Sequence, residues 1–196
     1  MMWKKRSFYE KTDIFVVETD RLLLRVVRQD ADKEVADYLI RNRSFHKPFH
    51  QYQPDIYFTQ QEQRMYILSD LKAFRRGDRC AFWISEKKRP QYVIGRLSFS
   101  AIVRGALSSC LVGYHLDKME TGKGYMREAL DGGCRYMFRN QELHRIQADV
   151  MPHNAPSIRC VESCGFKRQG LNEKYMCIDG KWQDHICFAK INEYFK

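Results

Sequence analysis

Two glycines stand between a short apolar segment and a helix-like pattern in residues 113–130, where Gly122 and Gly124 flank Lys123. A glycine-bearing loop at a helix start presents backbone N–H groups, and the helix dipole there favours negative charge. This spacing predicts a phosphate-binding loop, with a pyrophosphate as its ligand. The Rossmann and Walker patterns both fail because Tyr-Met-Arg follows Gly124. Hydride transfer and nucleotide hydrolysis are therefore disfavoured.

A second pair of residues with chemical potential is Asn154 and Ser157, which flank Pro156. Asn154 is expected to cap a helix over residues 156–164, because Asn is favoured at the N-cap and Pro in the first turn. This places the Ser157 hydroxyl at a helix start. The six histidines of the chain do not fall at ligand spacings, and no metal site is expected.

The elements that must position these residues follow from apolar periodicity and from helix start and stop signals. Thr59 and Glu62 form a capping box that opens a helix ending at Arg76 before Gly77. The other expected elements are strands over 19–27, 80–85, 92–103, 108–116 and 145–150, a helix over 31–41 capped by Asp30, a helix after Gly124, a helix over 156–164, and a hairpin of 175–178 with 182–189 around Asp179-Gly180. The helix after Gly124 carries an apolar stripe that is expected to face the core: Tyr125, Met126, Ala129, Leu130, Cys134, Met137 and Phe138.

Composition predicts one domain. With 196 residues and 44% hydrophobic content the chain can bury one sizeable core, expected over residues 19–196 behind a basic N-terminal extension, 1–18. Seven cysteines without a CxxC pair, together with the lack of a signal peptide or long apolar run, predict a cytoplasmic protein with reduced thiols. The net charge of +10 favours polyanionic surroundings such as the ribosome and a ligand with several phosphates. Neither membrane association nor direct DNA binding is expected.

Residues 119–124, Met-Glu-Thr-Gly-Lys-Gly, resemble the Gln/Arg-x-x-Gly-x-Gly/Ala signature of the GNAT superfamily of acyl-CoA-dependent N-acetyltransferases. Met119 stands where the family usually has Gln or Arg. If backbone N–H groups do most of the binding, one missing side-chain hydrogen bond costs about 1 kcal/mol. The resemblance implies an α+β (mixed α/β) fold with a central, mostly antiparallel sheet of about seven strands and helices on both faces.

Four further segments resemble the RimJ/RimL ribosomal-protein N-terminal acetyltransferases, most closely the alanine-directed RimJ type. They are Thr19-Asp-Arg-Leu-Leu-Leu-Arg25, His144-Arg-Ile, Asn154-x-x-Ser157 with Cys164-Gly-Phe166, and Ile178-Asp-Gly-Lys-Trp-Gln-Asp-His185. Within these segments Asp20 with Arg21, His144 with Arg145, and Cys164-Gly-Phe166 are interpreted as structural.

The resemblance implies that acetyl-CoA is the cosubstrate and that a free amine attacks its acetyl carbonyl directly, through a tetrahedral intermediate. The residues implied to bind it are Tyr114, His115, Leu116, Met119, Glu120, Thr121, Gly122, Lys123, Gly124, Asn154 and Ser157. Ser157 would protonate or hydrogen-bond the departing sulfur, and a strand N–H near residues 114–116 would stabilise the intermediate. Some relatives use a glutamate as base, but Met176 occupies that register here. Glu173 is the nearby candidate, and a water chain serves equally.

An N-terminal α-amine is an acceptor that needs little help from a general base, because a substantial part of it is already neutral at physiological pH. An α-amine of pKa about 8 is roughly one-fifth neutral near pH 7.4, whereas a lysine is about a thousandth neutral. The expected acceptor is the N-terminal alanine of a ribosomal protein, with association with the ribosome. Aromatic and histidine residues between the first two helices are interpreted as loop packing or as the roof of the acceptor groove. Two alternatives stay open: an acetyltransferase for a small amine such as an antibiotic, polyamine or amino acid, and a ribosome-associated assembly factor with little turnover.

Overall fold

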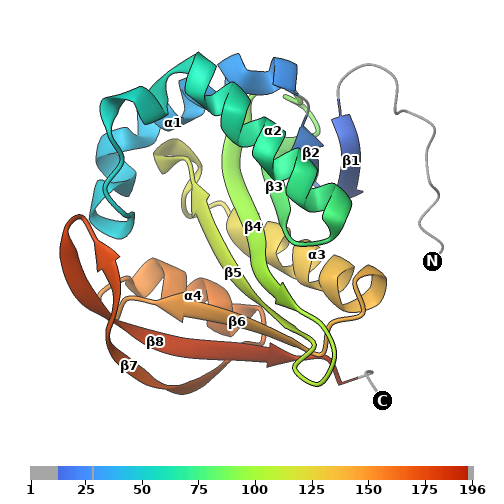
Figure 1. The fold of residues 1–196 in the computed structure, drawn as a ribbon, viewed down its shortest axis with the longest axis vertical. Helices are drawn as coiled ribbons and strands as arrows, with labels where there is room; N and C mark the ends of the chain where they lie inside the picture. Colours follow the sequence, from blue (N-terminus) through green and yellow to red (C-terminus); the bar gives the residue numbers. More distant parts are fainter. Residues whose placement is uncertain (1–12, 28, 194–196) are drawn as a thin grey trace.

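The structure, a computed structural model, describes residues 13–27 and 29–193. Its centre is an eight-stranded sheet in the order β1-β2-β3-β4-β5-β6-β8-β7 (Figure 1). The strands are β1 (Asp13–Glu18), β2 (Leu22–Val27), β3 (Cys80–Glu86), β4 (Val93–Val103), β5 (Ser109–Leu116), β6 (Arg145–Val150), β7 (Lys167–Ile178) and β8 (Lys181–Ile191). Neighbouring strands are antiparallel except β5 and β6, which are parallel. The mixed α/β class and the mostly antiparallel sheet are confirmed.

Helices cover both faces of the sheet, as expected. They are α1 (Asp32–His46), α2 (Gln60–Arg76), α3 (Tyr125–Asn140) and α4 (Ala155–Ser163). Figure 1 shows α1 and α2 in front of the sheet and α3 and α4 behind it. No helix in the described ranges is long and apolar enough to cross a membrane.

Several expected boundaries are wrong, and one of them is the end of α1, which lies at His46 and not at residue 41. Strand β1 lies inside the segment expected as an extension, because β1 pairs along β2 and gains a full ladder of backbone hydrogen bonds; residues 1–12 of that extension lie outside the described ranges. Asp30 does not cap the first helix: a 3-10 turn, Gln29–Ala31, precedes α1, and its N-cap, Ala31, has no side-chain cap bond. Strand β7 begins at Lys167, well before the expected residue 175, because it pairs with β8 from Lys167 opposite Ala189 to Ile178 opposite Lys181.

Local signals gave the correct limits of α2. The Thr59 hydroxyl accepts a hydrogen bond from the Glu62 N–H, and Gly77 ends the helix in the left-handed conformation with φ of +77°. The hairpin turn is also as expected, since Asp179 and Gly180 both have positive φ.

Helix α3 packs unusually close to the sheet because two consecutive glycines face it. A Cβ placed on Gly133 would lie 2.5 Å from Leu97 Cδ2, and one on Gly132 would lie 2.7 Å from Thr19 Cγ2. The expected apolar stripe supports the same face: Met126, Ala129, Leu130, Cys134 and Met137 are buried, and Tyr125 and Phe138 are partly buried. This packing fixes the N-terminus of α3 beside the end of β5.

The sheet opens between its two parallel strands. Strands β5 and β6 pair only from Ser109 opposite Arg145 to Leu111 opposite Gln147. Beyond that point β5 continues against β4 as far as Leu116, while β6 continues against β8 as far as Val150. The carboxyl ends of β5 and β6 therefore diverge, as Figure 1 shows. The first turn of α4 lies across this opening.

Candidate active site

Two hydroxyl groups meet at the opening. The Tyr114 hydroxyl on β5 lies 2.8 Å from Ser157 Oγ on α4 and also donates to the Ser157 carbonyl oxygen at 3.2 Å. Asn154 is the N-cap of α4, as expected, and its Oδ1 accepts the Ser157 N–H at 3.2 Å. Burial raises the pKa of Tyr114 above its ordinary value, so the phenol stays protonated at neutral pH. The pair can therefore donate a hydrogen bond to a group in the opening.

The backbone of β5 also presents polar groups to the opening. The Ser108 carbonyl bonds the Arg145 N–H of β6, whereas the Asp117 N–H bonds the Ile94 carbonyl of β4. The backbone N–H and C=O groups of successive residues point to opposite edges of a strand. The N–H and C=O groups of Tyr114 and Leu116 therefore point away from β4 and toward the opening. The Leu116 carbonyl there accepts a hydrogen bond from His46 Nε2 at 2.8 Å.

Next along the chain, the glycine loop forms an array of unpaired donors. Within the described part of the chain, the backbone N–H groups of residues 122–127 have no hydrogen-bond acceptor. Gly122 and Gly124 make this possible with φ of +79° and +77°, a left-handed conformation that other residues adopt at a cost. The Gly124 carbonyl meanwhile accepts the Glu128 N–H at 3.1 Å, which begins helix α3. Consecutive free N–H groups at a helix start are suited to bind a phosphate.

Arg21 braces this loop from the start of β2. Its Nε lies 2.6 Å from Glu128 Oε2, and its Nη1 donates to the Lys123 carbonyl oxygen at 3.1 Å. Thr19 Oγ1 adds a 2.6 Å bond to the same Glu128 carboxylate. The sequence analysis interpreted Arg21 as structural and did not predict its contact with the loop, because 102 residues separate Arg21 from Lys123. Its guanidinium adds positive charge next to the free N–H groups.

The side chains of residues 119–123 mainly hold the loop itself. The buried Glu120 carboxylate binds Lys123 Nζ at 2.8 Å and Arg89 Nη2 at 2.9 Å. Burial alone would raise the pKa of Glu120, but these two cations hold it below its ordinary value. Thr121 Oγ1 donates to the Lys118 carbonyl, and the Met119 side chain is 75% exposed without a polar atom to offer. The capacity to bind an anion thus rests on the backbone and on nearby cations.

On the other face of β5, three histidine rings pack together. The centroids of His46, His50 and His115 are 4.9 to 5.2 Å apart, and His115 Nδ1 lies 2.6 Å from the Tyr38 hydroxyl. Burial, followed by the charges of His46 and Arg96, lowers the pKa of His50 to about 4. Burial likewise lowers the pKa values of His46 and His115, so the cluster is neutral at pH 7.

A cavity of about 310 Å³ adjoins this cluster between the α1–α2 connection and the β7–β8 turn. His46, His50, Tyr57, Phe58 and Asp179 are among the residues that line it. The Asp179 N–H bonds the His50 carbonyl at 3.2 Å, which ties the hairpin to this wall. The aromatic and histidine segment singled out in the sequence therefore both packs the loop and bounds a small cavity.

Glu173 has no hydrogen bond or ion pair with any of these groups in the described ranges. It is exposed, in an irregular part of β7 between Asn172 and Met176, and its carboxylate has no partner in the described ranges. Among the same residues, no group of three or more His, Cys, Asp or Glu side chains is arranged to hold a metal ion.

A family model described as an acetyltransferase (GNAT) domain matches residues 21–167. The chain belongs to the GNAT acetyltransferase family. It is 35% identical over 173 residues to the [ribosomal protein uS5]-alanine N-acetyltransferase of Escherichia coli K12, covering 87% of this chain and 88% of the relative.

Solved structures agree. The ribosomal-protein-S5-alanine acetyltransferase of Vibrio fischeri matches with a TM-score of 0.88 and 31% identity, covering 93% of this chain and 99% of the other. RimJ of Mycobacterium smegmatis, solved in complex with CoA-disulfide, matches with a TM-score of 0.85 and 25% identity, covering 91% and 87%. The GNAT fold and the resemblance to the RimJ/RimL type are confirmed, and the protein is an N-acetyltransferase.

Proposed function

We propose that this GNAT enzyme transfers the acetyl group of acetyl-CoA to the N-terminal α-amine of a protein, most fittingly the N-terminal alanine of a ribosomal protein in the cytoplasm. The use of acetyl-CoA as the acetyl donor is supported by the opening between β5 and β6, which is flanked by the Tyr114–Ser157 hydroxyl pair and by the free N–H groups of residues 122–127. The choice of a protein N-terminus as the acceptor is supported by the names of the relatives from Escherichia coli and Vibrio fischeri.

The pyrophosphate, the pantetheine arm and the thioester of acetyl-CoA would meet successive groups along the opening. The N–H groups from Gly122 to Arg127 would bind the pyrophosphate, with Arg21 and Lys123 supplying positive charge nearby. The pantetheine arm would then lie along β5 at Tyr114 to Leu116 and past Asn154 at the start of α4. The bound cosubstrate supplies an acetyl thioester, whose sulfur would lie beside the Ser157 hydroxyl.

The chemistry asked of the chain is modest. The amine forms the new N–C bond while the acetyl oxygen becomes negative, and the Tyr114 or Leu116 N–H is placed to stabilise that charge. When the C–S bond breaks, Ser157 donates its proton or a hydrogen bond to the departing thiolate, and the adjacent Tyr114 hydroxyl can resupply it.

The amine must also lose a proton. Glu173 is the candidate carboxylate, since its side chain is exposed and unpaired among the described residues, and a water chain from the histidine cluster is the alternative. Either route suffices for an α-amine, whose pKa of about 8 leaves a useful neutral fraction at pH 7.4. Met176, at the register where relatives place a glutamate, is partly buried and cannot accept a proton.

The acceptor side chain would enter the 310 Å³ cavity beside the histidine cluster. A cavity of this size admits an N-terminal Ala or Ser without selecting for a small residue, and neutral imidazoles can accept hydrogen bonds from an amine. The preference for a small first residue therefore rests on the relatives and not on the cavity volume.

The test is acetylation of purified ribosomal proteins with acetyl-CoA, followed by mass spectrometry. We expect one acetyl group on an N-terminal Ala or Ser and release of one CoA thiol per acetyl group. Acetyl groups found only on lysine side chains, or only on an added aminoglycoside or polyamine, would show that the acceptor is not a protein N-terminus. They would leave acetyl-CoA as the acetyl donor. CoA binding without thiol release toward any acceptor would favour an assembly factor with little turnover.

A further inference from the structure

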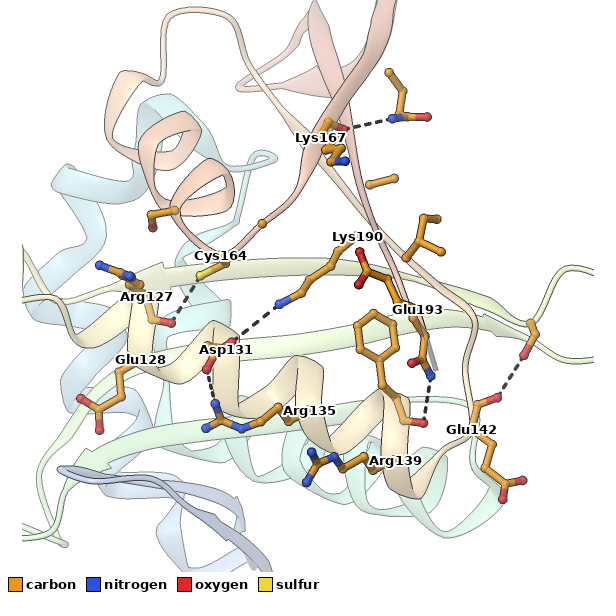
Figure 2. Close-up of a pocket in the computed structure, with 18 of the residues that line it drawn as sticks. Arg127, Glu128, Asp131, Arg135, Arg139, Glu142, Cys164, Lys167, Lys190 and Glu193 are labelled. Atoms are coloured by element: carbon orange, nitrogen blue, oxygen red, sulfur yellow. Dashed lines mark hydrogen bonds and ion pairs between the residues drawn. The ribbon is translucent and has the colours of Figure 1, made fainter. Parts of the chain in front are cut away.

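A second cavity begins at the glycine loop and extends away from the catalytic opening. It is a groove of about 1620 Å³ that follows the outward face of α3 from Gly124 to Glu142 and is closed on its other side by the ends of β7 and β8. Figure 2 shows Arg127, Asp131, Arg135 and Arg139 along α3, with Lys167 and Lys190 across from them. The 16 residues of α3 span about 24 Å, which gives the length of the groove.

Positive side chains predominate along this groove. It is lined by seven cationic and four acidic side chains. The cationic ones are Arg21, Arg104, Arg127, Arg135, Arg139, Lys167 and Lys190. On α3 they recur with Asp131 at intervals of four residues, which places them in one row on the helix surface.

Several of these cations are uncompensated. Asp131 pairs with Arg135 and with Lys190, so that one acidic side chain is shared between two cations. Arg104 donates to the neutral side chain and carbonyl of Gln141 and keeps its full charge available. Across the ranges that the structure describes, Arg127, Arg139 and Lys167 have no carboxylate partner, and all three are exposed.

The far half of the groove is separate from the acetyl-CoA site. Arg139 lies 15 residues after Gly124 along the chain, which corresponds to about 22 Å along the helix axis. Arg104 and Lys167 come from the β4–β5 connection and from the start of β7, neither of which contributes to the opening. One cosubstrate therefore leaves these cations unused.

We propose that this groove binds the phosphate backbone of an RNA strand. The proposal rests on the proposed function, which brings the enzyme to ribosomal proteins and hence to ribosomal RNA. A row of cations along a 24 Å groove can contact several successive phosphates, which releases condensed counterions and gives affinity without reading sequence. Among the described lining residues Phe138 is the one aromatic side chain, so base stacking contributes little.

The shape of the surface favours RNA over other anionic partners. A membrane is flat and would not reach cations set along a concave groove between a helix and a sheet. An acidic polypeptide carries charge on flexible side chains rather than at regular intervals along its backbone, and it is the competitor that the experiment includes. The expected interaction is weak, independent of sequence and strongly dependent on salt.

The experiment measures binding of a fluorescein-labelled 20-nucleotide single-stranded RNA by anisotropy between 50 and 200 mM salt, with CoA at saturation. The variant Arg139→Gln/Lys167→Gln removes two groove charges. Its matched control, Lys72→Gln/Arg75→Gln, removes two exposed charges from α2 on the opposite face of the sheet. Acetylation of a free alanine-starting peptide is measured for all three proteins.

We expect the parent and the control to bind RNA with CoA present and the groove variant to bind more weakly. The slope of log K against log salt should fall in magnitude by about 1.4 in the groove variant, since each single-strand phosphate contact contributes about 0.7. Peptide acetylation should be equal in all three. Equal slopes for groove variant and control, loss of RNA binding when CoA is added, or equally strong competition by polyglutamate would each overturn the proposal. Absence of peptide acetylation with the RNA result intact would instead reject only the proposed acetyl transfer.

Discussion

The hydroxyls of Tyr114 and Ser157 are 2.8 Å apart and join strand β5 to helix α4 where the sheet opens. Both residues were candidates on sequence grounds, and only the structure shows that their hydroxyl groups are in hydrogen-bond contact. A proton donated by one hydroxyl can be replaced through the other. Their effects on catalysis should consequently be coupled.

Replacement of Ser157 by Ala should lower turnover by roughly 10- to 1000-fold, because assistance to the departing thiolate is lost while CoA binding is kept. Tyr114→Phe should lower turnover less, and the double variant should lose less than the two single losses combined, as residues in contact are not additive. Steady-state kinetics with an alanine-starting peptide measures each value. Ser163→Ala is the control, since its exposed hydroxyl donates to the Cys160 carbonyl at the other end of α4 from Ser157. Unchanged kcat in Ser157→Ala would remove Ser157 from the mechanism.

Gly124→Val should sharply weaken CoA binding. Gly124 has φ of +77°, and a Cβ there would lie 3.5 Å from Arg21 Nη2, so a branched side chain strains the loop and crowds the phosphate site. Isothermal titration with CoA measures the loss. Gly77→Val is the matched control, because Gly77 also has φ of +77° but ends α2 with open space around it. Equal CoA affinity in parent and Gly124→Val would show that the loop does not bind the pyrophosphate.

The rate of acetyl transfer should rise with pH and level off with an apparent pKa near 8, the value of the α-amine, if chemistry limits the rate. The histidine cluster should not add a second step above pH 6.5, because the pKa of His50 is about 4 and those of His46 and His115 are also lowered. Single-turnover rates from pH 6 to 9.5 give the profile. If Glu173 accepts the proton, Glu173→Gln lowers the plateau; an identical profile in that variant assigns the step to water.

Stability should fall between pH 6.5 and pH 4. His50 has an unfolded pKa near 6.5 and a folded pKa of about 4, lowered by burial and by His46 and Arg96. Above pH 6.5 it is neutral in both states and has no effect, whereas below that pH the unfolded state takes up the proton first. At about 1.4 kcal/mol per pKa unit, the loss between pH 6.5 and 5 is at most about 2 kcal/mol.

Urea unfolding at pH 7.5, 6 and 5 tests this dependence. His50→Gln should reduce this dependence without abolishing it, because His46 and His115 also have lowered pKa values. The exposed His153→Gln should leave it as in the parent. A slope that is the same in the parent and in His50→Gln would show that His50 is not held neutral in the folded state.

Features set by neighbouring residues were predictable from the sequence. The limits of α2 follow from the Thr59 cap and Gly77, the start of α4 from Asn154, and the β7–β8 turn from Asp179-Gly180, since each depends on hydrogen bonds or dihedral angles within a few residues. The glycine loop belongs to the same class. Its φ values and its position at a helix start are local properties.

Features that depend on distant pairing were not predictable. Strand β1 exists because β2 offers it a free edge. The opening exists because the pairing of β5 with β6 ends at Leu111 and Gln147, while β5 continues along β4 and β6 continues along β8. Arg21 reaches the loop across 102 residues, and the basic groove gathers cations from α3, β7, β8 and the β4–β5 connection. The sequence by itself determined the glycine loop at a helix start, the caps of α2 and α4, and the family. Only the tertiary structure decided which side chains meet around them, because contacts between elements far apart in the chain form when the sheet and its covering helices pack together.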